Sequence, residues 1–158
     1  MLDRLRKVVV RPFVLGSIDG LVTSFVILAS GFAGDVAKSS VITIGVASLA
    51  ADAFSMGVSE YLSSRTEETL GDAAIMGLMC FLSFVVFGCV PLIAYAIAPP
   101  DAPAERSFAI VAFAIMLVIV SLLRASTTPG NKCRSIAEVL LLGAFAGAIA
   151  YGVAAAYS

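Results

Sequence analysis

The sequence predicts an all-α integral membrane protein, a bundle of five transmembrane helices. Hydrophobic residues make up 60% of the 158 residues and charged residues only 13%, about half the roughly 25% of a soluble domain. The mean hydropathy is +1.04. Stretches near the length of about 20 apolar residues that crosses a bilayer recur along the chain. The chain length suits a single transmembrane domain over residues 1–158.

The first span is predicted at residues 13–34, after a basic head at residues 1–12. A basic head before apolar and small residues also describes a cleaved secretory signal. We favour a retained span because the apolar region runs about 20 residues, enough to cross a bilayer, and contains Asp19. The segment Gly16–Gly20 is a GxxxG motif, which permits close helix packing but is a weak signal on its own.

The second span is predicted at residues 41–62, directly after a short turn at residues 35–38. The first two spans therefore form a helical hairpin. The charged loop that follows, residues 63–72, is too short to form a domain.

The last three spans are predicted to be almost entirely apolar scaffold. The third covers residues 73–98 and contains Pro91, which should kink it. The fourth covers residues 108–123 and is expected to face lipid. The fifth covers residues 136–157, and its own GxxxG motif should pack against other helices.

The distribution of basic residues predicts a cytoplasmic N-terminus by the positive-inside rule. With five spans, the basic head and the loops after the second and fourth spans lie on one side of the membrane. That side holds Arg4, Arg6, Lys7, Arg11, Arg65, Arg124, Lys132 and Arg134, and the other side holds only Lys38 and Arg106.

Composition also excludes several classes of function. The chain has no histidine, which removes Ser-His and Cys-His catalysis and His-based zinc or copper sites. Cys80, Cys89 and Cys133 show no CxxC or disulfide pattern and are interpreted as core or loop thiols. The sequence has no basic patch beyond the N-terminus, so a nucleic-acid-binding function is not indicated. We expect neither an enzyme nor a bound prosthetic group.

The second span carries an unusual polar stripe. Asp52, Met56 and Glu60 are spaced i, i+4, i+8, so they share one helix face. A charged side chain near the bilayer centre costs at least roughly 2.5–3.5 kcal/mol and indicates function by default. The alternatives are that the acids only join helices and that Met56 only packs.

The predicted depths of these residues form a ladder. At a rise of about 1.5 Å per residue, Asp19 and Met56 each lie roughly 9 Å from the cytoplasmic ends of their spans. Glu60 lies closer to the cytoplasm, and Asp52 lies roughly 15 Å in. We therefore predict a stepwise cation path from Glu60 through Asp19 and Met56 to Asp52.

The ligand types limit the cation. Carboxylates suit magnesium, calcium or manganese, and a thioether favours later divalent metals such as Fe²⁺. A symmetric dimer would place two copies of Asp19 and of Met56 at the same depth in the membrane, and so provide more ligands for one ion. Because carboxylates in a low dielectric take up protons readily, exchange of metal for protons is physically natural.

At these residues the chain resembles the vacuolar iron transporter family, which includes the plant nodulin-like proteins. Residues 16–23 and residues 51–63 carry the resemblance, together with the five-span plan. It implies a homodimer that moves Fe²⁺ or Mn²⁺ out of the cytosol against protons, in a cell inner membrane or a vacuole-like organellar membrane. It also implies that Asp19 and Met56 are the pathway acid and methionine, and Glu60 belongs to the family's Glu-Tyr pair.

The sequence departs from the family pattern at three places. Family members of one type have a cytoplasmic metal-binding domain where this chain has only residues 63–72, although nodulin-like members also lack it. Pro12 stands where many members have an acid, and Ser48 stands where some members have a glutamate. We infer from the spacing that Asp52, one turn after Ser48, supplies the negative charge that Ser48 lacks.

Two other functions compete with transport. Asp19 and Asp52 loosely fit an intramembrane aspartyl protease dyad, but their predicted depths differ by roughly 6 Å and the sequence contexts are absent. A non-transporting metal-binding or scaffold protein of the same family remains open because of Pro12 and Ser48.

Overall fold

The computed structural model describes residues 2–127 and 131–157, and these residues are almost entirely helical, without a strand. Five helices are long and apolar enough to cross a membrane. The all-α prediction is thereby confirmed. In chain order the elements are α1 (Leu2–Leu5), the π-helical turn η1 (Arg6–Val10), α2 (Arg11–Ala33), α3 (Lys38–Ser64), α4 (Leu70–Ile97), α5 (Ala102–Thr127) and α6 (Lys132–Tyr157).

The helices are longer than hydropathy alone predicts. The basic head is itself helical, and α5 starts at Ala102 rather than at residue 108. The physical reason is that hydropathy marks where lipid contact ends, whereas a helix continues as long as its backbone hydrogen bonds and side-chain pairs support it. α4 likewise continues as one helix through the buried Pro91, and the kink expected there stays a prediction.

α2 packs closely along α4. A Cβ atom on Gly16 would collide with the carbonyl oxygen of Cys80, and one on Gly20 would collide with that of Phe84. One turn further on, the Ser24 hydroxyl donates a 2.6 Å hydrogen bond to the Gly88 carbonyl oxygen. The first GxxxG motif therefore joins two helices of the same chain.

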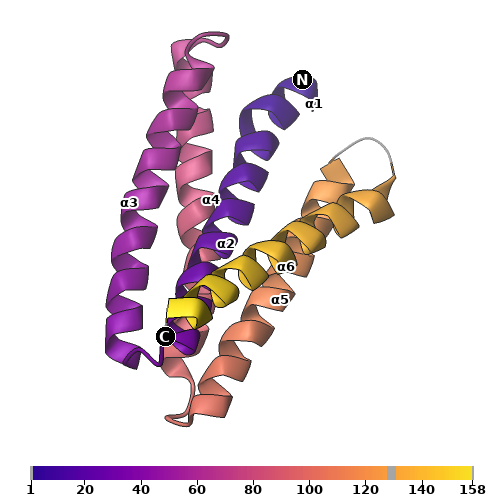
Figure 1. Cartoon of the computed structure of the whole chain (residues 1–158). Helices are drawn as coiled ribbons and strands as arrows, with labels where there is room; N and C mark the ends of the chain where they lie inside the picture. The colour runs from indigo at the N-terminus through magenta and orange to yellow at the C-terminus, as the bar shows by residue number, and fades with distance from the viewer. Residues whose placement is uncertain (1, 128–130, 158) are drawn as a thin grey trace.

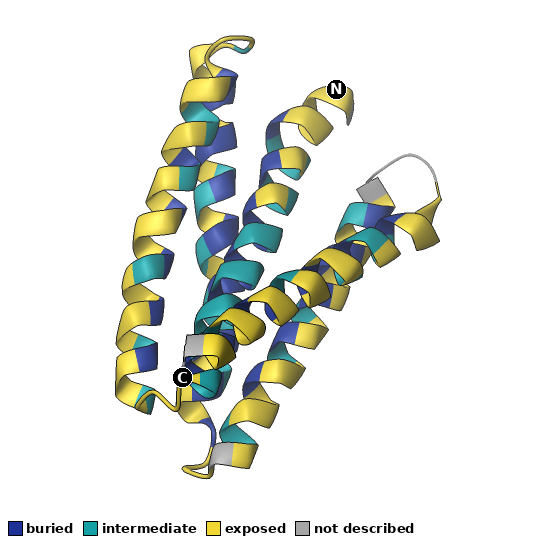
Figure 2. Cartoon of the chain, viewed as in Figure 1, coloured by how far each residue is buried: buried dark blue, intermediate teal, exposed yellow. Residues whose placement is uncertain are grey.

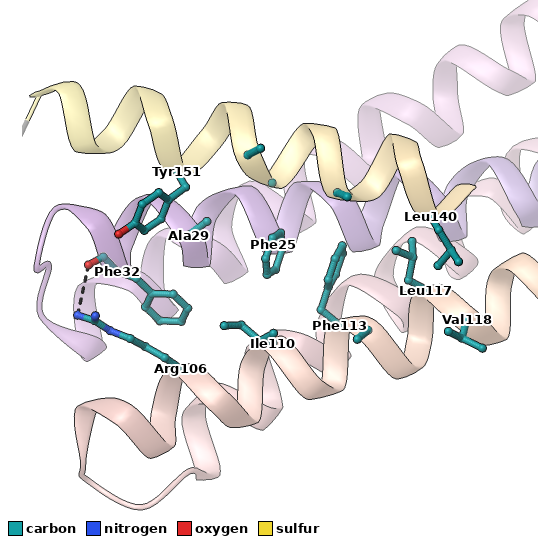
Figure 3. Close-up of a pocket in the computed structure, with 14 residues that line it drawn as sticks. Phe25, Ala29, Phe32, Arg106, Ile110, Phe113, Leu117, Val118, Leu140 and Tyr151 are labelled. Atoms are coloured by element: carbon teal, nitrogen blue, oxygen red, sulfur yellow. Dashed lines mark hydrogen bonds between the residues drawn. The ribbon is translucent and has the colours of Figure 1, made fainter. Parts of the chain in front are cut away.

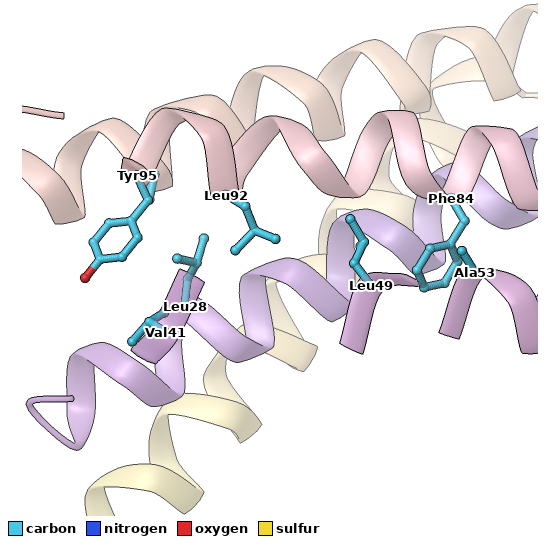
Figure 4. Close-up of a cluster of buried hydrophobic side chains, with 8 residues drawn as sticks. Leu28, Val41, Leu49, Ala53, Phe84, Leu92 and Tyr95 are labelled. Carbon is cyan, nitrogen blue, oxygen red and sulfur yellow. The ribbon is translucent and has the colours of Figure 1, made fainter. Parts of the chain in front are cut away.

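α3 packs on the same helix at a second glycine contact. A Cβ atom on Gly77 of α4 would lie 2.7 Å from the carbonyl oxygen of Gly57 on α3. At the other end of this contact lies a buried apolar cluster, drawn in Figure 4. The cluster consists of Leu28, Val41, Leu49, Ala53, Phe84, Leu92, Tyr95 and Ala109.

A second cluster joins α5 and α6 to the rest of the molecule. Its buried members are Leu21, Phe87, Phe113, Leu117, Val120 and Val139. The Phe25 and Phe113 rings stack with their centroids 4.0 Å apart. A Cβ atom on Gly143 would lie 2.7 Å from Leu117, and one on Gly147 would collide with the Phe25 ring. The packing role predicted for the last GxxxG motif is thus confirmed.

The outer faces of the helices are exposed and apolar, as a lipid environment requires. Figure 2 shows buried residues turned toward the inside of the bundle and exposed residues on its outside. Exposed large side chains on α5 include Ile110, Val111 and Ile115, in agreement with the prediction that the fourth span faces lipid.

The chain ends lie toward opposite ends of the bundle (Figure 1), as five spans require. The N-terminus lies at the same end as the α3–α4 connection, the end of α5 and the start of α6. At that end Arg4 pairs with Asp72 at 2.6 Å, and Lys7 pairs with Glu68. Near the other end Lys38 pairs with Glu105 at 2.9 Å. Ion pairs therefore connect the helices near both ends of the bundle.

Candidate functional site

The polar stripe lies along one side of α3. Ala53 and Gly57 are buried against α4, and the residue just before each of them belongs to the stripe. Asp52 is exposed near the middle of α3, whereas Met56 and Glu60 are half-buried. The helix therefore places the three side chains on one face, as their spacing requires.

Asp19 lies on α2 beside the stripe. Its side chain is half-buried, and it comes directly before Gly20, which packs on α4. The carboxyl groups of Asp19 and Asp52 are close enough for their charges to interact. The first two predicted spans thus bring their acids toward one another.

Cys80 of α4 is a neighbour of this group that the sequence did not assign to it. The thiol is fully buried and close enough to interact with the charges of Glu60 and Asp19. Cys80 lies here because it is one turn from the buried Phe84, on the face of α4 that packs against Gly16 of α2. Nothing in the local sequence distinguishes it from a packing cysteine, and all three cysteines are free.

The acids of this group have few partners within the chain. In the described part of the chain, the side chains of Asp19 and Asp52 have neither an ion pair nor a hydrogen bond, and that of Glu60 accepts only a long hydrogen bond, 3.5 Å from the Ser64 hydroxyl. Placing a carboxylate in a low-dielectric region without a partner is costly. The arrangement therefore favours a cation or protons as partners for these groups.

The acids and thiols of one copy form no metal cluster in the described part of the chain. Among residues 2–127 and 131–157, no three Cys, Asp or Glu side chains lie close enough together to hold a metal ion. Met56 also packs partly against the buried cluster that contains Leu49, Ala53 and Phe84, which supports its packing interpretation. The roles of Asp19, Asp52, Met56 and Glu60 stay predictions.

Ser48 and Pro12, the two positions where the sequence lacks an acid of the family pattern, lie on different helices. Ser48 is half-buried on α3, one turn before Asp52 and on the same side. Pro12 is buried at the start of α2, directly after the π-helical turn η1, in which the Arg11 N–H donates to the Arg6 carbonyl oxygen. Pro12 is thus compatible with the helix, while Ser48 extends the polar stripe.

Curated relatives of this chain carry transporter names. A stretch of 64 residues is 41% identical to a vacuolar iron transporter of Toxoplasma gondii and covers 40% of this chain and 21% of that protein. Vacuolar iron transporter 1 of Arabidopsis thaliana is 44% identical over 61 residues, which cover 38% of this chain and 24% of that protein. The same-named protein of Oryza sativa subsp. japonica is 47% identical over 60 residues, which cover 37% of this chain and 23% of that protein. The matched stretch thus covers less than a quarter of these relatives.

The family comparison covers much more of the chain. The model of the VIT family matches residues 10–76 and residues 70–155. These two matches together include all five membrane-crossing helices, the stripe on α3 and Asp19 on α2. The resemblance seen in the two short motifs therefore extends over the whole bundle, and the chain belongs to the VIT family.

Proposed function

We propose that this protein is a transporter that moves Fe²⁺, Mn²⁺ or both out of the cytosol in exchange for protons. The observation that carries the proposal is the group of acids without cationic partners on α2 and α3, in a chain of the VIT family. The names of the curated relatives support a metal as the substrate. In this function the protein catalyses no covalent chemistry.

The path runs along the stripe of α3 and the adjacent face of α2. Glu60 lies one turn from the end of α3 nearest the α3–α4 loop, and Asp52 lies near its middle. Carboxylate oxygens replace part of the hydration shell of the ion, and the Met56 thioether would favour Fe²⁺ over harder cations. When the ion leaves, the carboxylates take up protons because isolated negative charge is unfavourable in a low dielectric.

The functional unit is proposed to be a homodimer. Within the described residues of one chain, no three acidic or thiol ligands lie close together, and Asp52 is exposed. A two-fold axis beside the stripe would place Asp19 and Met56 of two copies around one path. Oxygen and sulfur ligands from both copies would then complete the coordination of the ion.

The protein is proposed to lie in its membrane with the N-terminus in the cytoplasm. The basic residues of α1, η1 and the first turn of α2 lie at the same end of the bundle as the α3–α4 connection, the end of α5 and the start of α6 (Figure 1). They are Arg4, Arg6, Lys7 and Arg11. This asymmetry follows the positive-inside rule. The relatives' names favour a vacuole-like organellar membrane over a cell inner membrane.

The alternative is a family member that binds metal without transporting it. Ser48 supports this alternative because it places a neutral group where another charge would strengthen the path. The two functions differ in flux and not in binding, so a flux measurement separates them.

The experiment is uptake of Fe²⁺ and Mn²⁺ into proteoliposomes that contain the purified full chain. Wild-type protein should transport, and Asp19→Asn should remove the flux while leaving a folded protein. The matched control is Asp35→Asn, because Asp35 lies exposed in the α2–α3 turn with φ of 50°, a conformation that asparagine tolerates. Binding of both metals without flux in wild-type protein would favour the alternative.

A further inference from the structure

A cavity lies away from the proposed metal path, between α2, α5 and α6 (Figure 3). Its volume is about 570 Å³. It is lined by Phe25, Ala29, Phe32, Arg106, Ile110, Phe113, Ala114, Leu117, Val118, Leu140, Ala144, Gly147, Ala148 and Tyr151. The cavity therefore lies between α5 on one side and α2 and α6 on the other (Figure 3).

The lining has one polar end and a long apolar remainder. Arg106 and Tyr151 are the only lining residues with polar side chains, and Figure 3 shows both at the end of the cavity near Phe32. From Arg106 to Val118 the α5 wall extends over roughly 18 Å. That length is close to one leaflet of a hydrocarbon core of about 30 Å.

Arg106 provides a positive charge without a carboxylate partner. Its guanidinium lies 5.8 Å from the centre of the Phe32 ring and donates a weak 3.4 Å hydrogen bond to the Phe32 carbonyl oxygen. In the described part of the chain, no acid forms an ion pair with it, because neighbouring Glu105 is paired with Lys38. Asp35 lines a small neighbouring pocket together with Arg106 but forms no described ion pair with it. Several N–H groups of Arg106 thus remain available to a phosphate.

The cavity also opens toward the lipid-facing surface. Ile110 and Val118 on its α5 wall are 48% and 44% exposed, and Ala144 and Ala148 on its α6 wall are exposed as well. A bilayer would therefore have direct access to an apolar cavity at the depth of its acyl chains.

We propose that this cavity binds an anionic phospholipid, with an acyl chain between α5 and α6 and the phosphate on Arg106. The charge favours this occupant over an apolar helix of a second copy, which would leave the guanidinium unpaired in the interface. An acyl chain fits the apolar length, and the Tyr151 hydroxyl is a further donor at the headgroup end.

The test uses tryptophan fluorescence, because the chain has no tryptophan of its own. Val118→Trp places a reporter on the cavity wall, and Val86→Trp places a matched reporter on the exposed face of α4. Each full-length variant is reconstituted in phosphatidylcholine vesicles that contain a minor fraction of brominated phosphatidylglycerol or of brominated phosphatidylcholine. Quenching then measures which lipid contacts each reporter.

The proposal expects brominated phosphatidylglycerol to quench the Val118→Trp reporter preferentially, by about fivefold for one basic contact near a membrane surface. Arg106→Gln should remove this preference, whereas Arg6→Gln, the same change at the other end of the bundle, should not. The Val86→Trp reporter should show no preference. Retention of phosphatidylglycerol through purification, lost in Arg106→Gln, provides a second measurement that needs no reporter.

Two results would overturn the proposal. Equal quenching of both reporters by both lipids would mean that the cavity contacts bulk lipid without selecting it. Absence of quenching at Val118→Trp by either lipid, with normal quenching at Val86→Trp, would mean that protein covers the cavity, as a second copy would.

Discussion

Two sets of acidic residues in this molecule lie in contrasting surroundings. Near the ends of the bundle Asp72, Glu68, Glu105 and Glu138 each pair with lysine or arginine. Within the bundle Asp19, Asp52 and Glu60 have no described ion pair. The paired acids connect helices and are explained by the fold. The unpaired acids within the bundle are costly in a low dielectric, and the proposed transport function would bring a cation to them.

The sharpest test of this comparison removes one unpaired acid. Asp52→Asn should lower Fe²⁺ and Mn²⁺ flux at least about tenfold, because an amide cannot balance the charge of the ion. The measurement is the initial rate of uptake into proteoliposomes. Asp101→Asn, in the exposed α4–α5 turn, is the control and should keep the wild-type rate. A wild-type rate in Asp52→Asn would remove this residue from the path.

A second test concerns protons. Because the unpaired carboxylates are proposed to exchange metal for protons, flux should rise when the pH on the trans side is lowered and fall when an ionophore dissipates the gradient. Metal uptake and the internal pH are followed together in the same vesicles. Flux that ignores the gradient would indicate a uniporter and leave the carboxylates as metal ligands only.

A third test concerns selectivity within the stripe. Met56→Leu keeps the volume and the packing against the α3–α4 cluster but removes the thioether. The ratio of Fe²⁺ to Mn²⁺ flux should therefore fall several-fold with little change in unfolding temperature. Competition between the two metals in one uptake assay gives the ratio directly. Equal losses for both metals would assign Met56 to packing.

The smallest effect is expected for a paired acid. Glu105→Gln removes the ion pair with Lys38 and should lower the free energy of unfolding by about 1 kcal/mol or less, since such pairs near a surface contribute little. Flux should remain at the wild-type level. Unfolding is followed in detergent, with Asp101→Asn as the variant that changes an acid without breaking a pair. A large loss of flux in Glu105→Gln would weaken the distinction between the two kinds of acid.

The fold class was predictable because hydrophobic stretches of membrane-crossing length leave the backbone little choice but helix. Helix ends were less predictable, since Glu105 and Arg106 continue α5 beyond the apolar stretch. Within the candidate site, the shared face of Asp52, Met56 and Glu60 follows from local spacing alone. The position of Cys80 beside Asp19 and Glu60 could not be predicted from local spacing, because it depends on how α4 packs against α2 and α3.

The sequence by itself determined five apolar helices, the unequal distribution of basic residues and the intramembrane acids, because all three depend on residue type and short-range spacing. Only the tertiary structure decided that Gly16 and Gly20 pack on α4, that Asp19 approaches Asp52, and that a cavity with one arginine separates α5 from α6. Those features depend on which helix faces which. In a bilayer, small residues and close packing choose helix partners, and the hydrophobic pattern alone does not specify them.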